Sequence, residues 1–455
     1  MALRSYLTMA GAVLALAVPL ALGAAGPARA LDVQRVVSEQ GIEAWLVEDH
    51  ANPIISMNLA FRGGAALDPE GKAGVANLAS ALLDQGAGDL DSQEFQEALA
   101  QNAIKMSFSA RQDSFGASMQ TLRENRDLAA ELFALALTEP RFDEGAVERR
   151  KSQILAGIAQ RAERPQTIAS QAFARLLFPD HPYGRPTEGT RETVPEITAE
   201  DLRDFVGTRF SRDNLVIGVS GAIEPEELKP LLDQAFGALP EAPARSVDVA
   251  DAQPQAAGET VVIERNVPQS WVVFGQEGVR RDDPDYYAVS VVNHILGGGS
   301  FASRLYKHVR EDRGLVYSVY TYLDPREHTA LFSGGFGTSN AQVGEAMTVV
   351  RDEWRRLAEE GPSEEEVEDA KSYLIGSFAL QLSSTGNIAS VLRAIQFHDL
   401  GIDHLERRSE LIESVSHEDA KRLAAELLNA DSLRIVAVGQ AEGLEPTRPA
   451  PEEGI

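Results

Sequence analysis

The feature that most constrains the fold of this chain is an internal repeat. Residues 198–228, TAEDLRDFVGTRFSRDNLVIGVSGAIEPEEL, align without a gap with residues 416–446, SHEDAKRLAAELLNADSLRIVAVGQAEGLEP, at an offset of 218. A second pair, FDEGAVERRKSQILAG at 142–157 and PSEEEVEDAKSYLIGS at 362–377, aligns at an offset of 220. Blocks that recur at nearly one spacing predict two copies of one structural unit in a single chain.

The pattern inside each copy is that of an α+β unit. The tripeptide Ile-Ala-Ser recurs at 168–170 and 388–390, again 220 residues apart. ISMNLAFRGG at 55–64 alternates apolar with small or polar residues, which predicts a strand, and WVVFGQEGV at 271–279 has the same place in the second copy. We therefore predict two homologous α+β halves, each an antiparallel-rich sheet with packed helices.

The expected division of the chain follows from the repeat and from a change in composition. The first half is expected at 31–238 and the second at 260–446. Between them, LPEAPARSVDVADAQPQAAGE at 239–259 is rich in Pro, Ala and acids without a period, which predicts a linker. Residues 447–455 are expected to form a disordered tail.

The first 30 residues read as a leader rather than as part of either half. One early charge, Arg4, precedes an apolar run that ends in the small-x-small sequence Ala28-Arg29-Ala30, as at a signal-peptide cleavage site. The alternative is a membrane anchor, but the run at 12–25 contains Pro19 and is short for a span of about 20 residues. We expect cleavage, export to the periplasm or beyond, and no stable membrane span afterwards.

Composition excludes several classes of function. The 455-residue chain has no cysteine, which removes thiolate catalysis and cysteine-based zinc sites. Its formal net charge of −27 repels phosphate backbones, so nucleic acid is not an expected partner.

Four stretches in a fixed order carry a family resemblance: FRGGAALDPEGKAGVANLASALL, HPYGRPTEGT (181–190), NLVIGVSGAIEPEEL and LGGGSFASRLYKHVREDRGLVYSVYTY (296–322). With the repeat, they resemble the pitrilysin/insulinase (M16) family of zinc peptidases, which includes the processing-peptidase subunits and bacterial periplasmic relatives. The resemblance covers nearly all of 31–446. It implies the M16/LuxS-like metallopeptidase fold, with the two halves arranged as a clamshell around a peptide-binding chamber.

The same resemblance shows what this chain lacks. Catalytic members carry His-x-x-Glu-His on a helix after the first strand, where two His at i and i+4 share one face and the Glu acts as base. Carried onto this chain, these positions fall on Asn77, Ser80 and Ala81, and the distal Glu ligand falls on Gly157. None of the four can supply the chemistry that zinc hydrolysis needs. No metal or other cofactor is therefore expected in this chain.

No replacement metal site is evident in the sequence. The chain has eight His, and no two of them are four residues apart around a Glu. Ligands from distant segments are not excluded by this, and a self-sufficient metallopeptidase with relocated ligands stays open as an alternative.

The second half keeps a different part of the family's site. In the family, an Arg and a Tyr seven residues apart in the C-terminal half reach toward the zinc and help to hold substrate. The segment VREDRGLVY places them on Arg310 and Tyr317. From the residues alone, a solvated helix charge and a packed strand aromatic are the favoured explanation of this pair. The resemblance favours a substrate clamp, since a guanidinium and a phenol are good donors to a carbonyl that gains negative charge.

The combination predicts a non-catalytic subunit of a heterodimeric M16 peptidase that is inactive alone. The expected partner is a homologous subunit that carries His-x-x-Glu-His and the zinc. The expected substrate is an extended peptide added to a sheet edge, with KMSFSARQDSFGASMQ at 105–120 as the candidate strand. The second alternative is a non-enzymatic binding or assembly protein that keeps the fold for its interfaces only.

Overall fold

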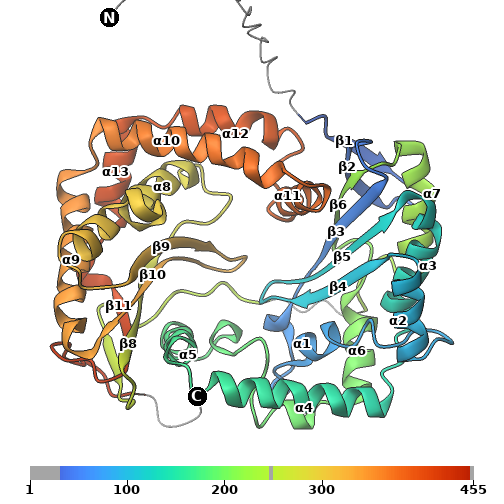
Figure 1. The fold of residues 1–455 in the computed structure, drawn as a ribbon, viewed down its shortest axis with the longest axis horizontal. Coiled ribbons are helices and arrows are strands. Elements are labelled where there is room, and N and C mark those ends of the chain that lie inside the picture. Colours follow the sequence, from blue (N-terminus) through green and yellow to red (C-terminus); the bar gives the residue numbers. More distant parts are fainter. Residues whose placement is uncertain (1–30, 245–248, 451–455) are drawn as a thin grey trace, which may run out of the picture.

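The computed structural model describes residues 31–244 and 249–450, so the predicted signal peptide lies outside the described residues. Two mixed sheets, each covered by helices, face each other across the molecule (Figure 1). This is the predicted α+β architecture of two halves arranged as a clamshell.

The first sheet has six strands in the spatial order β1-β2-β6-β3-β5-β4. Only β2 and β6 run parallel; the other neighbours are antiparallel. The strands are β1 Gln34–Val37, β2 Glu43–Glu48, β3 Ile54–Arg62, β4 Lys105–Ala110, β5 Ser114–Leu122 and β6 Leu215–Gly221.

The second sheet repeats this topology without a counterpart of β1. Its five strands have the order β7-β11-β8-β10-β9, and again one neighbouring pair, β7 and β11, is parallel. The strands are β7 Thr260–Ile263, β8 Gln269–Glu277, β9 Ser318–Pro325, β10 Ala330–Ser339 and β11 Arg434–Val438. The edge strands β4 and β9 are therefore counterparts.

Thirteen α-helices cover the two sheets within the described residues. In the first half they are α1 Val75–Ser80, α2 Ser92–Gln101, α3 Arg126–Thr138, α4 Glu144–Arg161, α5 Pro165–Leu177, α6 Ala199–Arg209 and α7 Pro225–Phe236. In the second half they are α8 Tyr286–Asn293, α9 Val343–Glu360, α10 Glu364–Phe378, α11 Thr385–Phe397, α12 His404–Glu413 and α13 His417–Leu427. Two π-helical turns, His294–Gly298 and Tyr306–Glu311, follow α8.

The two halves exchange a pair of helices. Helix α5 of the first half packs on β8 and β11 of the second sheet, and α11 of the second half packs on β2, β3 and β6 of the first (Figure 1). The repeated Ile-Ala-Ser tripeptides begin these contacts, since Ile168 joins a buried cluster with Val436, and Ile388 one with Trp45. Burial of apolar surface thus ties each half to the other half's sheet.

The predicted linker is tied down at both ends rather than free. In its described part, Ala252 N donates to His328 O at 2.8 Å, and Gln255 N donates to Leu177 O at 2.9 Å. Order also extends into the predicted tail, because Thr447 N donates to Thr260 O at 2.9 Å. Both segments therefore bridge the two halves or close the second sheet.

One expectation about local structure needs correction. The stretch 105–120 is a hairpin of β4 and β5 with its turn at residues 111–113, not one strand. Helix α1 ends at Ser80, although Leu82 and Leu83 are still buried in the turns that follow. Among the described residues, none of the helices combines the length and apolarity needed to cross a bilayer.

Candidate functional site

In the segment of helix α1, the residues at the degenerate motif positions face away from the core. Along residues 75–83, only Asn77, Ser80 and Ala81 are not fully buried, while Val75 and Leu78 pack inside. Ala81 N donates to Asn77 O at 3.2 Å, so these two positions keep the one-turn relation that two histidine ligands would need. The backbone of this segment thus keeps residues 77 and 81 one helical turn apart, whatever side chains they carry.

A buried carboxyl holds the start of α1. Asp68 accepts hydrogen bonds from Gly74 N at 2.9 Å and Ala76 N at 3.1 Å, and its side chain lies inside the fold. Burial raises the pKa of Asp68 to about 6, although the two backbone donors and the charges of Arg209 and Arg185 oppose this rise. The Asp-Pro turn seen in the sequence is therefore the anchor of this helix.

Gly157, the fourth degenerate position, lies on α4, which packs against α1. A Cβ built there would meet Arg161 Nη1 at 3.2 Å, the mobile end of a side chain. A longer side chain would thus need only a shift of Arg161.

The structure brings Arg310 and Tyr317 together in the second half. Arg310 lies on the π-helical turn Tyr306–Glu311, and Tyr317 immediately precedes β9. The Arg310 guanidinium carbon lies 4.6 Å from the Tyr306 ring centroid and 5.3 Å from that of Tyr317. Two aromatic faces therefore hold this cation by cation–π attraction.

Both members of the pair are open to a ligand. Tyr317 is 82% exposed, which no packed strand residue would be. Within the described residues Arg310 forms no salt bridge, because the neighbouring Asp312 pairs with His308 at 2.9 Å. Arg310 is thus held by aromatic rings rather than by the acidic residues beside it.

Comparison with known proteins identifies the family of this chain. The sequence profile described as Insulinase (Peptidase family M16) matches residues 44–191, and the one described as Peptidase M16 inactive domain matches 196–374. This chain is similar to the crystal structure of a peptidase M16 inactive domain from Pseudomonas fluorescens, with 30% sequence identity and a TM-score of 0.84. The match covers 91% of this chain and 100% of that one. The chain belongs to the M16 peptidase family.

Curated relatives of this M16 chain carry two kinds of name. The non-peptidase homologue YmxG of Helicobacter pylori is 26% identical over 80% of this chain and 85% of its own length. An uncharacterised zinc protease of Streptomyces coelicolor is 31% identical over 66% of each chain.

The family's zinc does not fit the residues that this M16 chain has at the site. An amide, a hydroxyl, a methyl group and a hydrogen atom stand where two imidazoles, a base and a carboxylate would be needed. We therefore derive no reaction step through a metal at α1.

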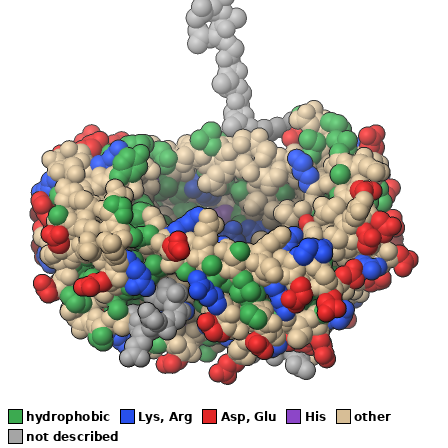
Figure 2. Space-filling model, turned by 60° about the horizontal axis from the view of Figure 1, so that its bottom comes forward, with side chains coloured by type: hydrophobic (Ala, Val, Ile, Leu, Met, Phe, Trp, Pro, Cys, Tyr) green, Lys and Arg blue, Asp and Glu red, His purple; other side chains and the backbone are tan. Residues whose placement is uncertain are grey.

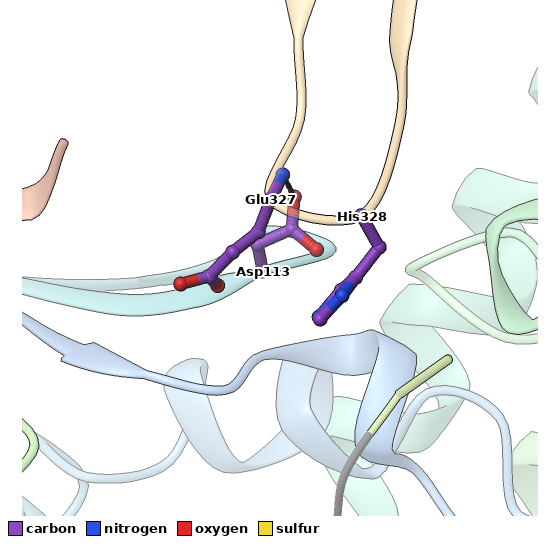
Figure 3. A group of neighbouring side chains, drawn as sticks. All are labelled: Asp113, Glu327 and His328. Carbon is purple, nitrogen blue, oxygen red and sulfur yellow. Dashed lines mark hydrogen bonds between the residues drawn. The ribbon is translucent and has the colours of Figure 1, made fainter. Parts of the chain in front are cut away.

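One group of side chains that sequence reasoning missed could hold a metal elsewhere. Asp113, from the turn between β4 and β5, meets Glu327 and His328, from the turn between β9 and β10 (Figure 3). One ligand atom from each lies within 4.8 Å of the others. No local spacing could reveal this group, because Asp113 lies more than 200 residues from Glu327 and His328 in the sequence.

The hydrogen bonds of this group indicate a contact between the halves rather than an open metal site. Asp113 accepts from Tyr183 Oη at 2.5 Å and from Glu327 N at 3.1 Å, which occupies both of its oxygens. Glu327 pairs with Arg62 at 3.1 Å, although burial raises the pKa of Glu327. We call Asp113, Tyr183, Glu327 and Arg62 the hairpin clasp.

The clasp borders a hollow between the two halves. A cavity of about 520 Å³ is lined by Arg62, Asp113, Glu327 and His328 among other residues. In the space-filling view, Lys and Arg side chains lie inside the hollow of the face shown, whereas Asp and Glu side chains gather mainly on its outer sides (Figure 2). The lining of the 520 Å³ cavity itself carries both signs of charge, with Arg62 and Arg209 beside Asp113 and Glu327.

Proposed function

We propose that this chain is the non-catalytic subunit of a heterodimeric M16 peptidase. It would supply Arg310 and Tyr317 to peptide substrate held at the zinc of a homologous partner that carries His-x-x-Glu-His. One contrast carries the proposal. The chain belongs to the family but has no zinc ligands at the motif positions, whereas Arg310 and Tyr317 lie together and, among the described residues, Arg310 has no salt bridge. The proposal includes export of the complex, in line with the leader at 1–30.

The chemistry of the pair suits this role. The carbonyl of an attacked peptide bond gains negative charge in the transition state, and fixed donors stabilise that charge without reorganising. The Arg310 guanidinium offers several N–H groups from a stacked position, and the exposed Tyr317 hydroxyl offers one more. The substrate backbone would pair with a free sheet edge, for which β4 and β9 are the candidates.

The decisive experiment mixes the purified chain with an M16 partner that carries the zinc motif and measures peptide cleavage. Each protein alone should be inactive and the mixture active. Arg310→Ala should lower kcat/KM about 10²- to 10³-fold, as loss of one oxyanion donor does elsewhere. Arg313→Ala is the matched control, because Arg313 is exposed nearby and only caps the carbonyl of His308.

The other readings make different predictions in the same assay. If the complex keeps full turnover in the Arg310→Ala, Tyr317→Phe double variant, the chain is an assembly subunit. If the pure chain cleaves peptides and retains metal through dialysis, it is self-sufficient, and Asp113, Glu327 and His328 become the ligands to substitute first.

A further inference from the structure

A second cavity lies within the second half, between α8, α10, α11 and α12. Its volume is about 640 Å³. The described residues that line it include two arginines and three histidines but no acidic residue: Arg281, Arg408, His294, His398 and His404. In a chain of net charge −27, a cationic pocket of this kind needs an explanation.

Aromatic faces rather than carboxylates hold Arg281. Its guanidinium carbon lies 4.1 Å from the Tyr286 ring centroid and 5.2 Å from that of Tyr287. Arg281 Nη2 donates to Tyr287 Oη at 3.1 Å, and Tyr287 Oη lies 2.8 Å from His404 Nε2. Most of the N–H groups of Arg281 therefore stay free for a ligand.

His404 acts here as a neutral acceptor. Burial lowers its pKa to about 4, and the charges of Arg281, Arg407 and Arg408 act in the same direction. Arg281 Nη2 lies 3.4 Å from His404 Nε2, and a guanidinium only donates, so Nε2 is the acceptor atom. His404 thus orients Tyr287 and Arg281 without adding or removing charge at neutral pH.

An aromatic ring also holds Arg408, on another wall of the cavity. Its guanidinium carbon lies 4.1 Å from the Phe378 ring centroid, and Arg408 Nη1 donates to Leu374 O at 3.2 Å. Neither Arg408 nor Arg281 forms a salt bridge with any described residue. Two guanidiniums thus face one cavity with no protein counter-charge.

The acids next to the lining residues in sequence are engaged elsewhere. Asp282 pairs with Arg280 at 3.5 Å, and Asp283 accepts from Asp285 N at 2.8 Å. Asp399 pairs with Arg62 at 3.0 Å, and Asp403 pairs with Arg407 at 2.6 Å. These contacts leave the positive charge of the cavity for a ligand to balance, because buried or half-buried charges are stable only when they are paired.

We propose that this pocket binds the carboxylate of a peptide, either its C-terminal carboxylate or an acidic side chain. A planar guanidinium matches a carboxylate with two parallel hydrogen bonds. The rest of the lining is largely apolar and aromatic, including Leu323, Tyr373 and Ile395, which suits an organic ligand rather than a free inorganic ion.

A path for the peptide leads to this pocket. Strand β9 is the edge of its sheet and begins directly after Tyr317. Tyr320 and Tyr322 stack along it with ring centroids 6.1 Å apart and are partly exposed, and Leu323 lines the pocket. An extended chain covers the distance from Tyr317 to Leu323, roughly 20 Å, with about six residues.

The pocket has a defined place in the repeat. Helices α4 and α10 are counterparts at the offset of 220, and Ser377, the counterpart of Gly157, lines the cavity. The second half thus has a cationic pocket where the first half has its degenerate zinc site. Binding here concerns this chain alone and does not depend on the proposed partner, so either proposal can fail without the other.

Fluorescence anisotropy with three dye-labelled versions of one short Ser/Val peptide tests the proposal on the full chain without its leader. The first version has a free C-terminal carboxylate, the second is amidated, and the third is amidated with one internal Glu. The first or third should bind at least about tenfold more tightly than the second, because charged hydrogen bonds contribute most of the difference. Which of the two binds identifies the source of the carboxylate.

The chain offers a closely matched control. Arg281→Gln with Arg408→Gln should abolish the preference for a carboxylate, whereas Arg280→Gln with Arg407→Gln changes the same net charge on neighbouring residues that already pair with acids. Arg281→Lys with Arg408→Lys retains the charge and most of the packing. This Lys variant should lose part of the preference for a carboxylate, and it replaces the Gln variant in the assay if the Gln variant does not fold.

Three results would overturn the proposal. Equal affinity for all three peptides would show that no carboxylate is recognised. An equal loss in both Gln variants would reduce the effect to net charge. Displacement of the acidic peptide by inorganic phosphate at a lower concentration than by acetate would assign the pocket to a phosphate group instead.

Discussion

The two halves share one topology but differ in the chemistry between their paired helices. In the first half, α1 and α4 present Asn77, Ser80, Ala81 and Gly157, which are small or neutral. In the second half, α8 and α10 border a pocket with two unpaired guanidiniums. The comparison teaches that two copies of one topology can carry neutral residues in one copy and a cationic cavity in the other.

Returning the ligands to the first half gives the largest expected effect. Asn77→His, Ala81→His and Gly157→Glu together should let the chain retain about one zinc after dialysis, because the scaffold around these positions is still folded. Elemental analysis measures this. Wild type and the Asn77→His single variant, which has one imidazole, are the controls. If the triple variant folds and stays free of metal, the first half has lost its geometry as well as its ligands.

The helix exchange predicts the next largest effect. A Cβ at Gly218 would lie 2.2 Å from Ala389 O of α11, so Gly218→Ala should lower the free energy of unfolding by about 3 kcal/mol. Urea unfolding measures this. Gly207→Ala is the control, since its Cβ meets nothing within 4 Å and alanine favours a helix by up to about 1 kcal/mol. The counterpart of Gly218 is Val436, so the second sheet does not need this close approach.

The Asp-Pro turns that precede α1 and α8 predict a smaller effect, a difference in how stability depends on pH. The folded-state pKa of Asp68, about 6, lies above its ordinary value of 3.8, so the proton is bound more tightly in the folded chain. The stability from this proton is fully present below pH 3.8 and is lost as the pH rises through 6. Relative to Asp68→Asn, wild type should therefore lose about 2 kcal/mol between pH 4.5 and pH 7.

Urea unfolding of both proteins at the two pH values tests this difference. Asp283→Asn is the matched control, because Asp283 occupies the equivalent Asp-Pro turn but is exposed to solvent. A change of the same size in both variants would mean that the two turns do not differ.

The repeat predicted much of this fold, for physical reasons that are easy to name. Period-two strands are local signals, and their recurrence in the two copies identified β3 with β8 and β6 with β11. The exchange of α5 and α11 was not predictable in this way. Ile168 and Ile388 mark apolar helix faces, but a helix pattern does not say which of two similar sheets it will cover.

The same distinction between local patterns and distant contacts applies to the candidate site residues. Arg310 and Tyr317 could be found because they lie close together in a recognisable segment, and the structure adds that Tyr306 stacks with them. The cationic pocket was missed because Arg281 lies more than 100 residues from His404 and Arg408, so no local spacing joins the three. The one available hint was that three of the eight histidines belong to its lining.

The exchanged helices also set the order in which the chain can fold. The face of the first sheet against α11 stays uncovered until residues 385–397 have been synthesised, although the strands of that sheet end at Gly221. Contacts this distant in sequence form slowly, because a long loop must close before they stabilise anything. The face of the first sheet that α11 covers can therefore be completed only when almost the whole chain has been synthesised.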